Sequence, residues 1–205
     1  MLRALARSAG YSMVEVIVVL LIMSVIYVMA MPTYTRMITN NAVRSATDSV
    51  AEGLRAARSE AIKNNTRVQF ALVSDMTATC TVPTSGVWPL NWIVSLDDPT
   101  TACNVAPSTT VAPRIIKFRV VSGRENQVTL TNASSVSCVL FNGLGQSLDC
   151  TSNAQLSFDY DFGASDTGTC EAVGGPVRCL RIQVARGGRI RTCDPALAST
   201  NPASC

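Results

Sequence analysis

The chain begins with two contrasting stretches, a basic segment at 1–10 and an apolar run at 13–31 in which Glu15 is the only charged residue. A helix over the apolar run would be about 28 Å long, which is enough to cross the hydrocarbon core of a bilayer. Two arginines and no acidic residue precede the run. This charge bias favours a cytoplasmic N-terminus with the rest of the chain exported. The pattern therefore predicts one membrane-spanning segment.

Hydrophobic residues recur beyond the apolar run at the spacing of one helix face. Pro32 would kink a helix, and Gly53 is a mild local weakness. We nevertheless expect one helix over about 11–63, ending near Asn64-Asn65. Its first half would be a membrane anchor, and its second half would pack on a globular domain. The positions of the stripe, separated by 7, 4, 3 and 4 residues, are Val43, Val50, Leu54, Ala57 and Ala61.

The pattern changes after residue 65 to short segments rich in Val, Ile and Phe, bounded by Gly, Pro, Ser or Asn. Such segments are typical of strands. The stretches 97–113 and 163–176 are rich in turn-forming residues and are expected to be loops. One helix followed by a run of strands predicts an α+β fold in which the helix covers an antiparallel sheet. The expected strands are 67–73, 92–96, 114–121, 127–130, 136–141, 156–160, 178–184 and 189–192.

Eight cysteines follow the apolar run, none of them in a CxxC pair, and the chain contains no histidine. Zinc sites usually use close cysteine pairs, often with histidine, so no zinc site is expected. An even number of dispersed cysteines indicates disulfides, which form in an oxidising compartment such as the periplasm. Many pairings are possible, and we favour nearest neighbours because each pair would close a short loop. The favoured pairs are Cys80–Cys103, Cys138–Cys150, Cys170–Cys179 and Cys193–Cys205.

Three interpretations of the N-terminal segment compete. A secretory signal peptide is the first, because Val28-Met29-Ala30 loosely resembles a cleavage site. A plain uncleaved anchor is the second. Neither explains Glu15, since a carboxylate in a membrane helix costs about 2.5–3.5 kcal/mol at the bilayer centre and less near its surface. The third interpretation is therefore that Glu15 has a function and a partner.

The sequence Gly10-Tyr11-Ser12-Met13-Val14-Glu15 resembles the class III signal of type IV prepilins. The resemblance implies that a prepilin peptidase cuts after Gly10, that the new amine on Tyr11 is methylated, and that Glu15 pairs with the N-terminal amine of a neighbouring subunit. A buried carboxylate becomes tolerable when assembly supplies such a charge. The implied organisation is a leader at 1–10, a membrane and filament-core half-helix at 11–35, and a periplasmic globular domain at 36–205. The chain would sit in the inner membrane before it joins other pilin subunits.

Further matches are spread along the chain and resemble the GspH/FimT family of minor pilins. They are Leu54 to Asn65 (LRAARSEAIKNN), Phe141 to Gly145 (FNGLG), and Gly188 to Pro195 (GRIRTCDP) followed by Cys205. The resemblance implies the type IV pilin fold and a minor subunit of a type IV pilus. A minor pseudopilin of a type II secretion system is the alternative. From the residues alone, the segment 57–61 is a close-packed helix end or a contact with a neighbouring subunit, and Phe141 is a core aromatic at a turn.

The last part of the chain is basic. Removal of Arg3 and Arg7 with the leader would lower the net charge from +3 to +1, so there is no global basic field. Residues 178–205, however, contain five arginines and one acid, whereas 142–177 contain five acids and no lysine or arginine. Gly187-Gly188 predicts a tight hairpin turn.

On the strand after this turn, Arg189 and Arg191 should face the same side, and Arg186 could join them across the turn. Guanidinium groups on an exposed edge suit phosphate oxygens. In the transformation-linked branch of the family, a GRxR hairpin is associated with DNA binding, and Gly188, Arg189 and Arg191 match it. The alternatives are that the arginines only solvate an edge strand or pair with the acids of 142–177.

Catalytic motifs are not evident in the sequence. Histidine, the commonest general base, is absent, and no nucleophile elbow, phosphate loop or metal motif occurs. Asp97-Asp98 and Asp159-x-Asp161 could bind calcium, but neither has the spacing of a calcium loop, and we favour surface acids. We expect no cofactor, no metal and no enzymatic activity. A periplasmic enzyme with a signal peptide remains the third class, and its mature chain would begin at Met31 instead of Tyr11.

Overall fold

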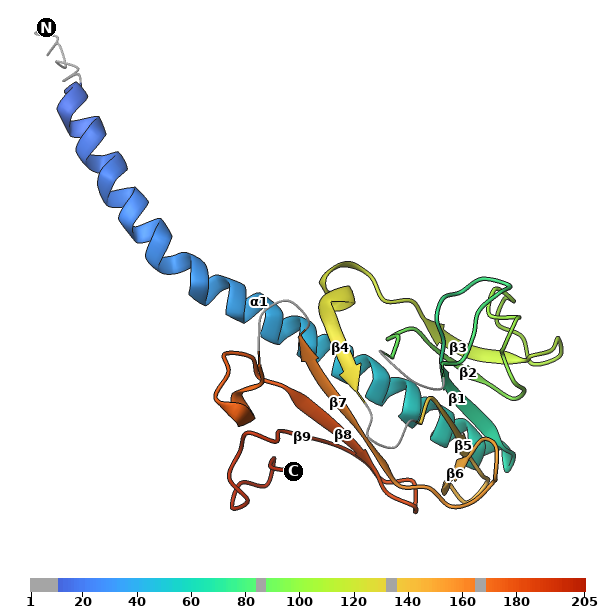
Figure 1. Cartoon of the computed structure of the whole chain (residues 1–205). Helices are drawn as coiled ribbons and strands as arrows, with labels where there is room; N and C mark the ends of the chain where they lie inside the picture. The colour runs from blue at the N-terminus through green and yellow to red at the C-terminus, as the bar shows by residue number, and fades with distance from the viewer. Residues whose placement is uncertain (1–10, 84–87, 132–135, 165–168) are drawn as a thin grey trace, which may run out of the picture. The chain divides into compact units, whose positions relative to one another are not determined.

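The computed structural model describes residues 11–83, 88–131, 136–164 and 169–205. Within these residues the chain forms one long helix, nine strands and two short 3-10 helices, η1 (Gly123–Gln127) and η2 (Glu171–Val173) (Figure 1). Two compact units can be separated, one ending at Ile38 and one running from Thr39 to Cys205. Gly10 and the rest of the predicted leader lie outside the described residues.

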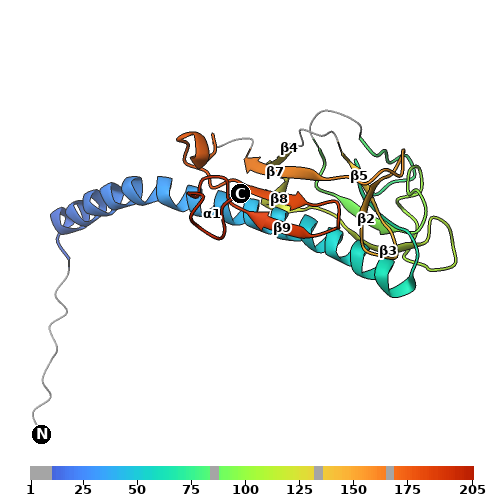
Figure 2. The ribbon, with the colours of Figure 1, turned by 90° about the horizontal axis from the view of Figure 1, so that it is seen from below.

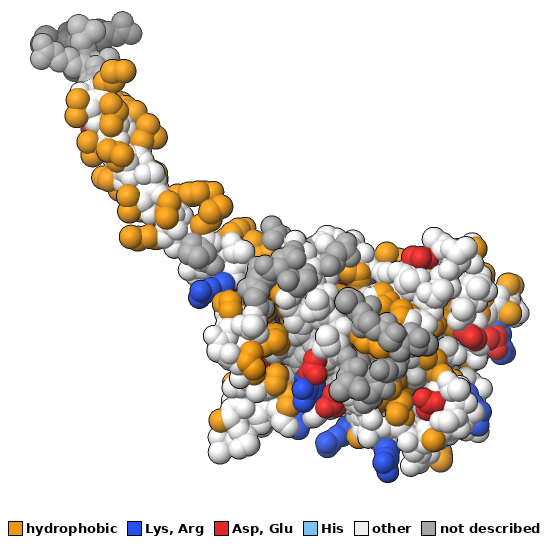
Figure 3. Space-filling view, viewed as in Figure 1, with side chains coloured by type: hydrophobic (Ala, Val, Ile, Leu, Met, Phe, Trp, Pro, Cys, Tyr) orange, Lys and Arg blue, Asp and Glu red, His pale blue; other side chains and the backbone are white. Residues whose placement is uncertain are grey.

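The first unit contains the N-terminal part of α1, a helix that extends from Met13 to Asn64. The helix expected over 11–63 is therefore confirmed, and its backbone stays helical through Pro32. Its N-terminal part has a window with a mean hydropathy of 2.7, and none of that window is buried in the protein. Hydrophobic side chains cover this part of the helix in Figure 3. Its length and composition are sufficient to cross a membrane.

The second half of α1 belongs to the other unit and lies along its strands (Figures 1 and 2). The predicted apolar stripe is the buried face, because every residue of the stripe from Val43 to Ala61 is fully buried. It joins one hydrophobic core with Phe70, Trp92, Phe141 and Tyr160. Burial of such side chains is the main favourable term in folding, at about 25 cal/mol per Å² of apolar surface.

The strands form two antiparallel sheets on which α1 packs, so the predicted α+β fold is confirmed, with two sheets in place of the one expected. The first has the order β3-β2-β1-β5-β6 and the second has the order β4-β7-β8-β9. Residues of both sheets contribute to the core that covers α1. The strands are β1 (Val68–Leu72), β2 (Trp92–Ser95), β3 (Ile115–Arg119), β4 (Val128–Thr131), β5 (Cys138–Phe141), β6 (Ser147–Asp149), β7 (Phe158–Ala164), β8 (Leu180–Val184) and β9 (Ile190–Cys193).

Each of the eight predicted strands overlaps an observed one, and β6 was missed. It has only three residues and pairs with β5 through Val139, Leu140 and Phe141. A segment this short carries too few positions for an alternating pattern to stand out. β6 can be recognised as a strand only from its pairing with β5.

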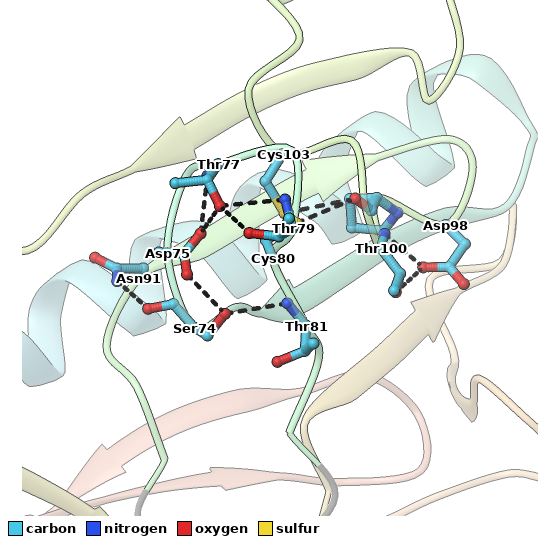
Figure 4. The surroundings of a disulfide bond; sticks show 11 residues. Ser74, Asp75, Thr77, Thr79, Cys80, Thr81, Asn91, Asp98, Thr100 and Cys103 are labelled. Atoms are coloured by element: carbon cyan, nitrogen blue, oxygen red, sulfur yellow. Dashed lines mark hydrogen bonds between the residues drawn. A yellow bond between two sulfur atoms is a disulfide. The ribbon is translucent and has the colours of Figure 1, made fainter.

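The eight cysteines form four disulfides, each between neighbours in sequence: Cys80–Cys103, Cys138–Cys150, Cys170–Cys179 and Cys193–Cys205. Cys80 and Cys103 are buried in a second, smaller core cluster with Ile93 and Ile115. Figure 4 shows how short polar bonds order the loops beside this disulfide, with Asp75 accepting from Thr77 and Asp98 accepting from Thr100. The disulfide therefore fastens a long connection that has little secondary structure of its own.

Gly53 lies where α1 packs against Phe70 of β1 and Trp92 of β2. A Cβ at this position would lie 2.7 Å from Phe70 Cε2 and 2.9 Å from Trp92 Cδ2. Glycine lowers the stability of an exposed helix by about 1 kcal/mol relative to alanine. Here it removes a clash between two large buried rings and the helix backbone, so the apparent weakness in the sequence is a packing requirement.

We predict that Gly53→Ala lowers the free energy of unfolding by about 1–3 kcal/mol, because an overpacked core forces its neighbours to shift. Denaturant unfolding would measure the loss, with Ser59→Ala on the exposed side of the helix as a control that changes stability by less than about 0.5 kcal/mol. Combining Gly53→Ala with Phe70→Leu should cost less than the sum of the two changes, since the smaller side chain relieves the clash. A Gly53→Ala protein as stable as the parent would contradict this account.

Candidate functional site

The predicted hairpin joins β8 and β9, which pair with Gln183 opposite Arg191 and Val184 opposite Ile190. In the turn, the Gly188 N–H donates to the Ala185 carbonyl at 2.7 Å, and the Ala185 N–H donates to the Arg189 carbonyl at 3.0 Å. Gly188 has a φ of +72°, in the left-handed region that favours glycine. A Cβ on Gly188 would also collide with the Gly145 carbonyl oxygen. Both its backbone angle and its surroundings therefore require glycine here.

Ser147, the first residue of β6, holds the hairpin tip in place. The Ser147 N–H donates to the Arg186 carbonyl at 3.2 Å, and the Ser147 hydroxyl lies 2.9 Å from the Ala185 carbonyl oxygen. Ser147 is fully buried, so these contacts are shielded from water. These hydrogen bonds fix the tip of the hairpin against β6 of the first sheet.

Two arginines of the basic stretch are neutralised by acids. Arg178 Nε donates to Asp194 Oδ2 at 2.6 Å. Arg181 bonds Asp161 at 2.6 and 3.1 Å, and its Nη1 lies 3.7 Å from Asp159. The hydrogen bond to Asp161 raises the pKa of Arg181 above its usual value. Pairing with the acids of 142–177, one of the alternatives in the sequence, thus applies to Arg181.

Arg186 and Arg189 are different. Both are exposed, and the described residues provide no acceptor or carboxylate for either guanidinium. Arg189 and Arg191 line the same pocket of about 230 Å³, together with Asp159 and Gln183. The prediction that Arg189 and Arg191 face one side of the sheet is confirmed, and Arg186 is not among the lining residues of this pocket.

Arg191 has a structural task as well. Its Nη2 donates to the Pro202 carbonyl at 2.9 Å and to the Ser204 carbonyl, both in the C-terminal loop. The Asp194 N–H donates to the Ala203 carbonyl at 2.8 Å, and Cys193–Cys205 closes the loop. Figures 1 and 2 place the C-terminus beside β8 and β9. Arg191 therefore fastens a loop along the edge strand β9, a partner that the GRxR pattern did not reveal.

The acids considered as calcium ligands have other partners. Asp97 accepts from Arg114 at 2.7 and 2.5 Å, and the hydrogen bond from Arg114 lowers the pKa of Asp97. Asp159 and Asp161 face Arg181, as above. Within the described ranges, no group of three or more His, Cys, Asp or Glu side chains is placed to hold a metal ion.

The predicted assembly residues lie at the start of α1. Tyr11 is 83% exposed, and Glu15 is exposed in the first turn of the helix. The backbone N–H groups of Glu15 and Val16 donate to the Ser12 carbonyl at 3.0 and 3.2 Å. The Glu15 carboxylate has no partner within the described residues and is available to a group from outside the chain.

One residue of the hairpin region was not predicted from the sequence. Arg58, on α1, donates from Nε to the Gly145 carbonyl at 3.1 Å. A Cβ on Gly188 would lie 3.0 Å from this same Nε. The three segments singled out in the sequence, around Arg58, Gly145 and Gly188, therefore meet at one point. That all three segments were singled out in the sequence was a signal, but they are far apart in sequence, so their contact could not be predicted.

Comparison with known proteins places this fold among pilins. Residues 46–188 match a family model described as Type II transport protein GspH. The crystal structure of the Pseudomonas aeruginosa type IV minor pilin FimU in space group P65 has a TM-score of 0.50 at 15% identity, covering 79% of this chain and 98% of that chain. A crystal of FimU in space group P21 has a TM-score of 0.47 at 16% identity, covering 80% and 96%. No curated protein sequence matches this chain.

We predict that Arg191→Gln loosens the C-terminal loop, because it removes a charged donor to two carbonyls. The loss should be about 1–3 kcal/mol, as is usual for hydrogen bonds made by charged groups. Hydrogen exchange of the amides between Asp194 and Cys205 would measure it, and exchange there should become faster. Arg186→Gln removes the same charge from the exposed tip and should leave these amides unchanged. Equal exchange in both variants would contradict the structural task of Arg191.

Proposed function

This chain belongs to the Type II transport protein GspH family of minor pilins and pseudopilins, and we propose that it is a minor subunit of a type IV pilus that also binds DNA through its arginine hairpin. Assembly with other pilin subunits follows from the family. The observation that carries the DNA-binding part is the pair of exposed guanidiniums, Arg186 and Arg189, without a carboxylate partner in the described residues.

The N-terminal half of α1 supports the assembly part of the proposal. A long apolar surface is stable only in lipid or against other apolar helices, and a pilus core offers the second environment. In the proposed route the leader 1–10 is removed after Gly10 and the Tyr11 amine is methylated. The segment 11–35 then spans the inner membrane, with 36–205 in the periplasm. On assembly, Glu15 pairs with the N-terminal amine of a neighbouring subunit. This ion pair offsets the cost of a carboxylate in an apolar environment and makes the contact between subunits specific.

The hairpin supports the DNA-binding part. Exposed arginines that lack acids offer fork-shaped donors to phosphate oxygens, and such contacts carry no sequence information. Few aromatic residues accompany the hairpin, so base stacking contributes little. The expected binding is weak, independent of sequence and sensitive to salt.

A minor pseudopilin of a type II secretion system is the second candidate, and the family's description favours it. That function needs the same membrane helix and the same Glu15 contact. In a pseudopilin, the unpaired Arg186 and Arg189 would have no ligand. DNA binding by the hairpin therefore separates the two candidates.

We predict that Glu15→Ala reduces incorporation into filaments more than about tenfold, because leaving one member of a buried ion pair alone costs roughly 3–5 kcal/mol. Sheared filaments would be quantified by immunoblot, and the N-terminus of the mature chain would be read by mass spectrometry, with Tyr11 expected first. Ser24→Ala is the matched control, since the Ser24 hydroxyl already donates to the Leu21 carbonyl at 2.8 Å within the helix. Normal incorporation of the Glu15→Ala chain would remove the assembly proposal.

For DNA binding we predict that the double variant Arg186→Gln, Arg189→Gln binds a short mixed-sequence duplex more weakly. The slope of log affinity against log salt should become shallower by about 0.9 for each phosphate that the variant no longer neutralises. Fluorescence anisotropy of the purified chain in non-ionic detergent would measure the slope. Arg44→Gln, Arg55→Gln is a double control with the same net charge, changed on the exposed side of α1. Identical slopes for the two double variants would reject the hairpin as the site and favour the pseudopilin.

A further inference from the structure

We propose that Arg58 of α1 is a third phosphate-binding residue beside Arg186 and Arg189, so that the DNA site extends from the hairpin tip onto the helix. The proposal rests on the proposed DNA binding and names a residue outside the hairpin. Arg58 is far from the hairpin in sequence, and only the fold brings it there.

Two glycines create the space that the Arg58 guanidinium occupies. A Cβ on Gly145 would lie 3.1 Å from Arg58 Nε, and a Cβ on Gly188 would lie 3.0 Å from it. Both glycines have a positive φ, of +75° and +72°. The side chain of Arg58 therefore passes between two backbone turns, where almost any other residue pair would exclude it.

The hydrogen bond to Gly145 orients Arg58 without neutralising it. Nε donates to a carbonyl at 3.1 Å, while Nη1 and Nη2 have no acceptor within the described residues. Arg178, Arg181, Arg114 and Arg119 differ, because each of them contacts a carboxylate. The nearest acid along the helix, Glu60, accepts from Asn64 and Lys63. Arg58 thus keeps its full charge, and its Nη1 and Nη2 have no partner in the described residues.

Such an arrangement suits a phosphate. Arg58 is half-buried and already oriented, so binding costs less side-chain entropy than for a free surface arginine. A guanidinium with Nε occupied still presents two terminal NH2 groups to phosphate oxygens. By contrast, Arg191 already uses Nη2 for hydrogen bonds to two carbonyls.

The three unpaired arginines lie on two segments, the second half of α1 and the hairpin, that meet at Gly188. Arg186 lies two positions before Gly188, Arg189 follows it, and Arg58 Nε approaches it from the helix. A duplex carries one negative charge for about every 1.7 Å of its axis, so neighbouring phosphates can meet several of these groups.

The test compares Arg58→Gln with Arg55→Gln, a change of the same charge three residues earlier on the same helix, at an exposed side chain without a partner in the described residues. Anisotropy titrations over about 50–200 mM salt would use the purified chain in non-ionic detergent and a short mixed-sequence duplex. We expect the salt slope to fall by about 0.9 for Arg58→Gln and to stay at the parental value for Arg55→Gln. Arg58→Lys keeps the charge but not the planar fork, and should retain the parental slope.

A merely structural Arg58 would lower thermal stability in Arg58→Gln and leave the slope unchanged, which would overturn the proposal. If the variant does not fold, the parent chain decides the matter. Phenylglyoxal modification followed by peptide mass spectrometry should find Arg58 protected by DNA and Arg55 modified equally with and without it. Equal modification of Arg58 in both conditions would also overturn it. A reduced slope in the Arg186, Arg189 double variant without any effect of Arg58→Gln would leave the hairpin function standing and reject Arg58. A parent chain that does not bind DNA would reject both.

Discussion

The packing of one helix face against two sheets is the constraint on which the rest of this structure depends. Each sheet has few strands and an apolar face that packs on α1, and neither could bury that face alone. The stripe from Val43 to Ala61 covers both, and Gly53 lets the helix backbone approach the rings of Phe70 and Trp92. Because interiors are close-packed, this contact fixes the position of the partly exposed side chains on the second half of α1.

Arg58 shows what this fixed position achieves. The helix that closes the core also delivers a cation to the tip of a hairpin formed by a distant part of the chain. Gly145 and Gly188 make the approach possible, and Ser147 holds the hairpin backbone from the other side. The glycines of this region therefore let the Arg58 side chain and two backbone turns approach one another closely.

In the second unit, the number of arginines in a stretch says less about its free charge than the partner that each arginine has. Arg178 and Arg181 lie in the most basic part of the sequence, yet each is bound to an aspartate, and Arg191 is bound to the C-terminal loop. In the hairpin region, Arg58, Arg186 and Arg189 have no carboxylate partner in the described residues. At the other end of the chain, Glu15 follows the same logic in reverse, as a carboxylate without a partner in the described residues on an apolar helix. In both places an unpaired charge in a defined setting is the feature that points to a partner.

The sequence by itself determined the features that depend on neighbouring residues. Periods of 3.6 and 2, hydropathy and turn-forming residues predicted α1, its buried stripe, the overlapping positions of eight strands and the Gly187-Gly188 turn, because these are local preferences written residue by residue. Only the tertiary structure decided the division into two sheets, the pairing of β6, and the partners of each arginine. Arg58 and Gly145 are 87 residues apart, and Arg191 meets carbonyls that any residue could supply. Such contacts leave no periodic trace, since they follow from where the packed core places each backbone segment.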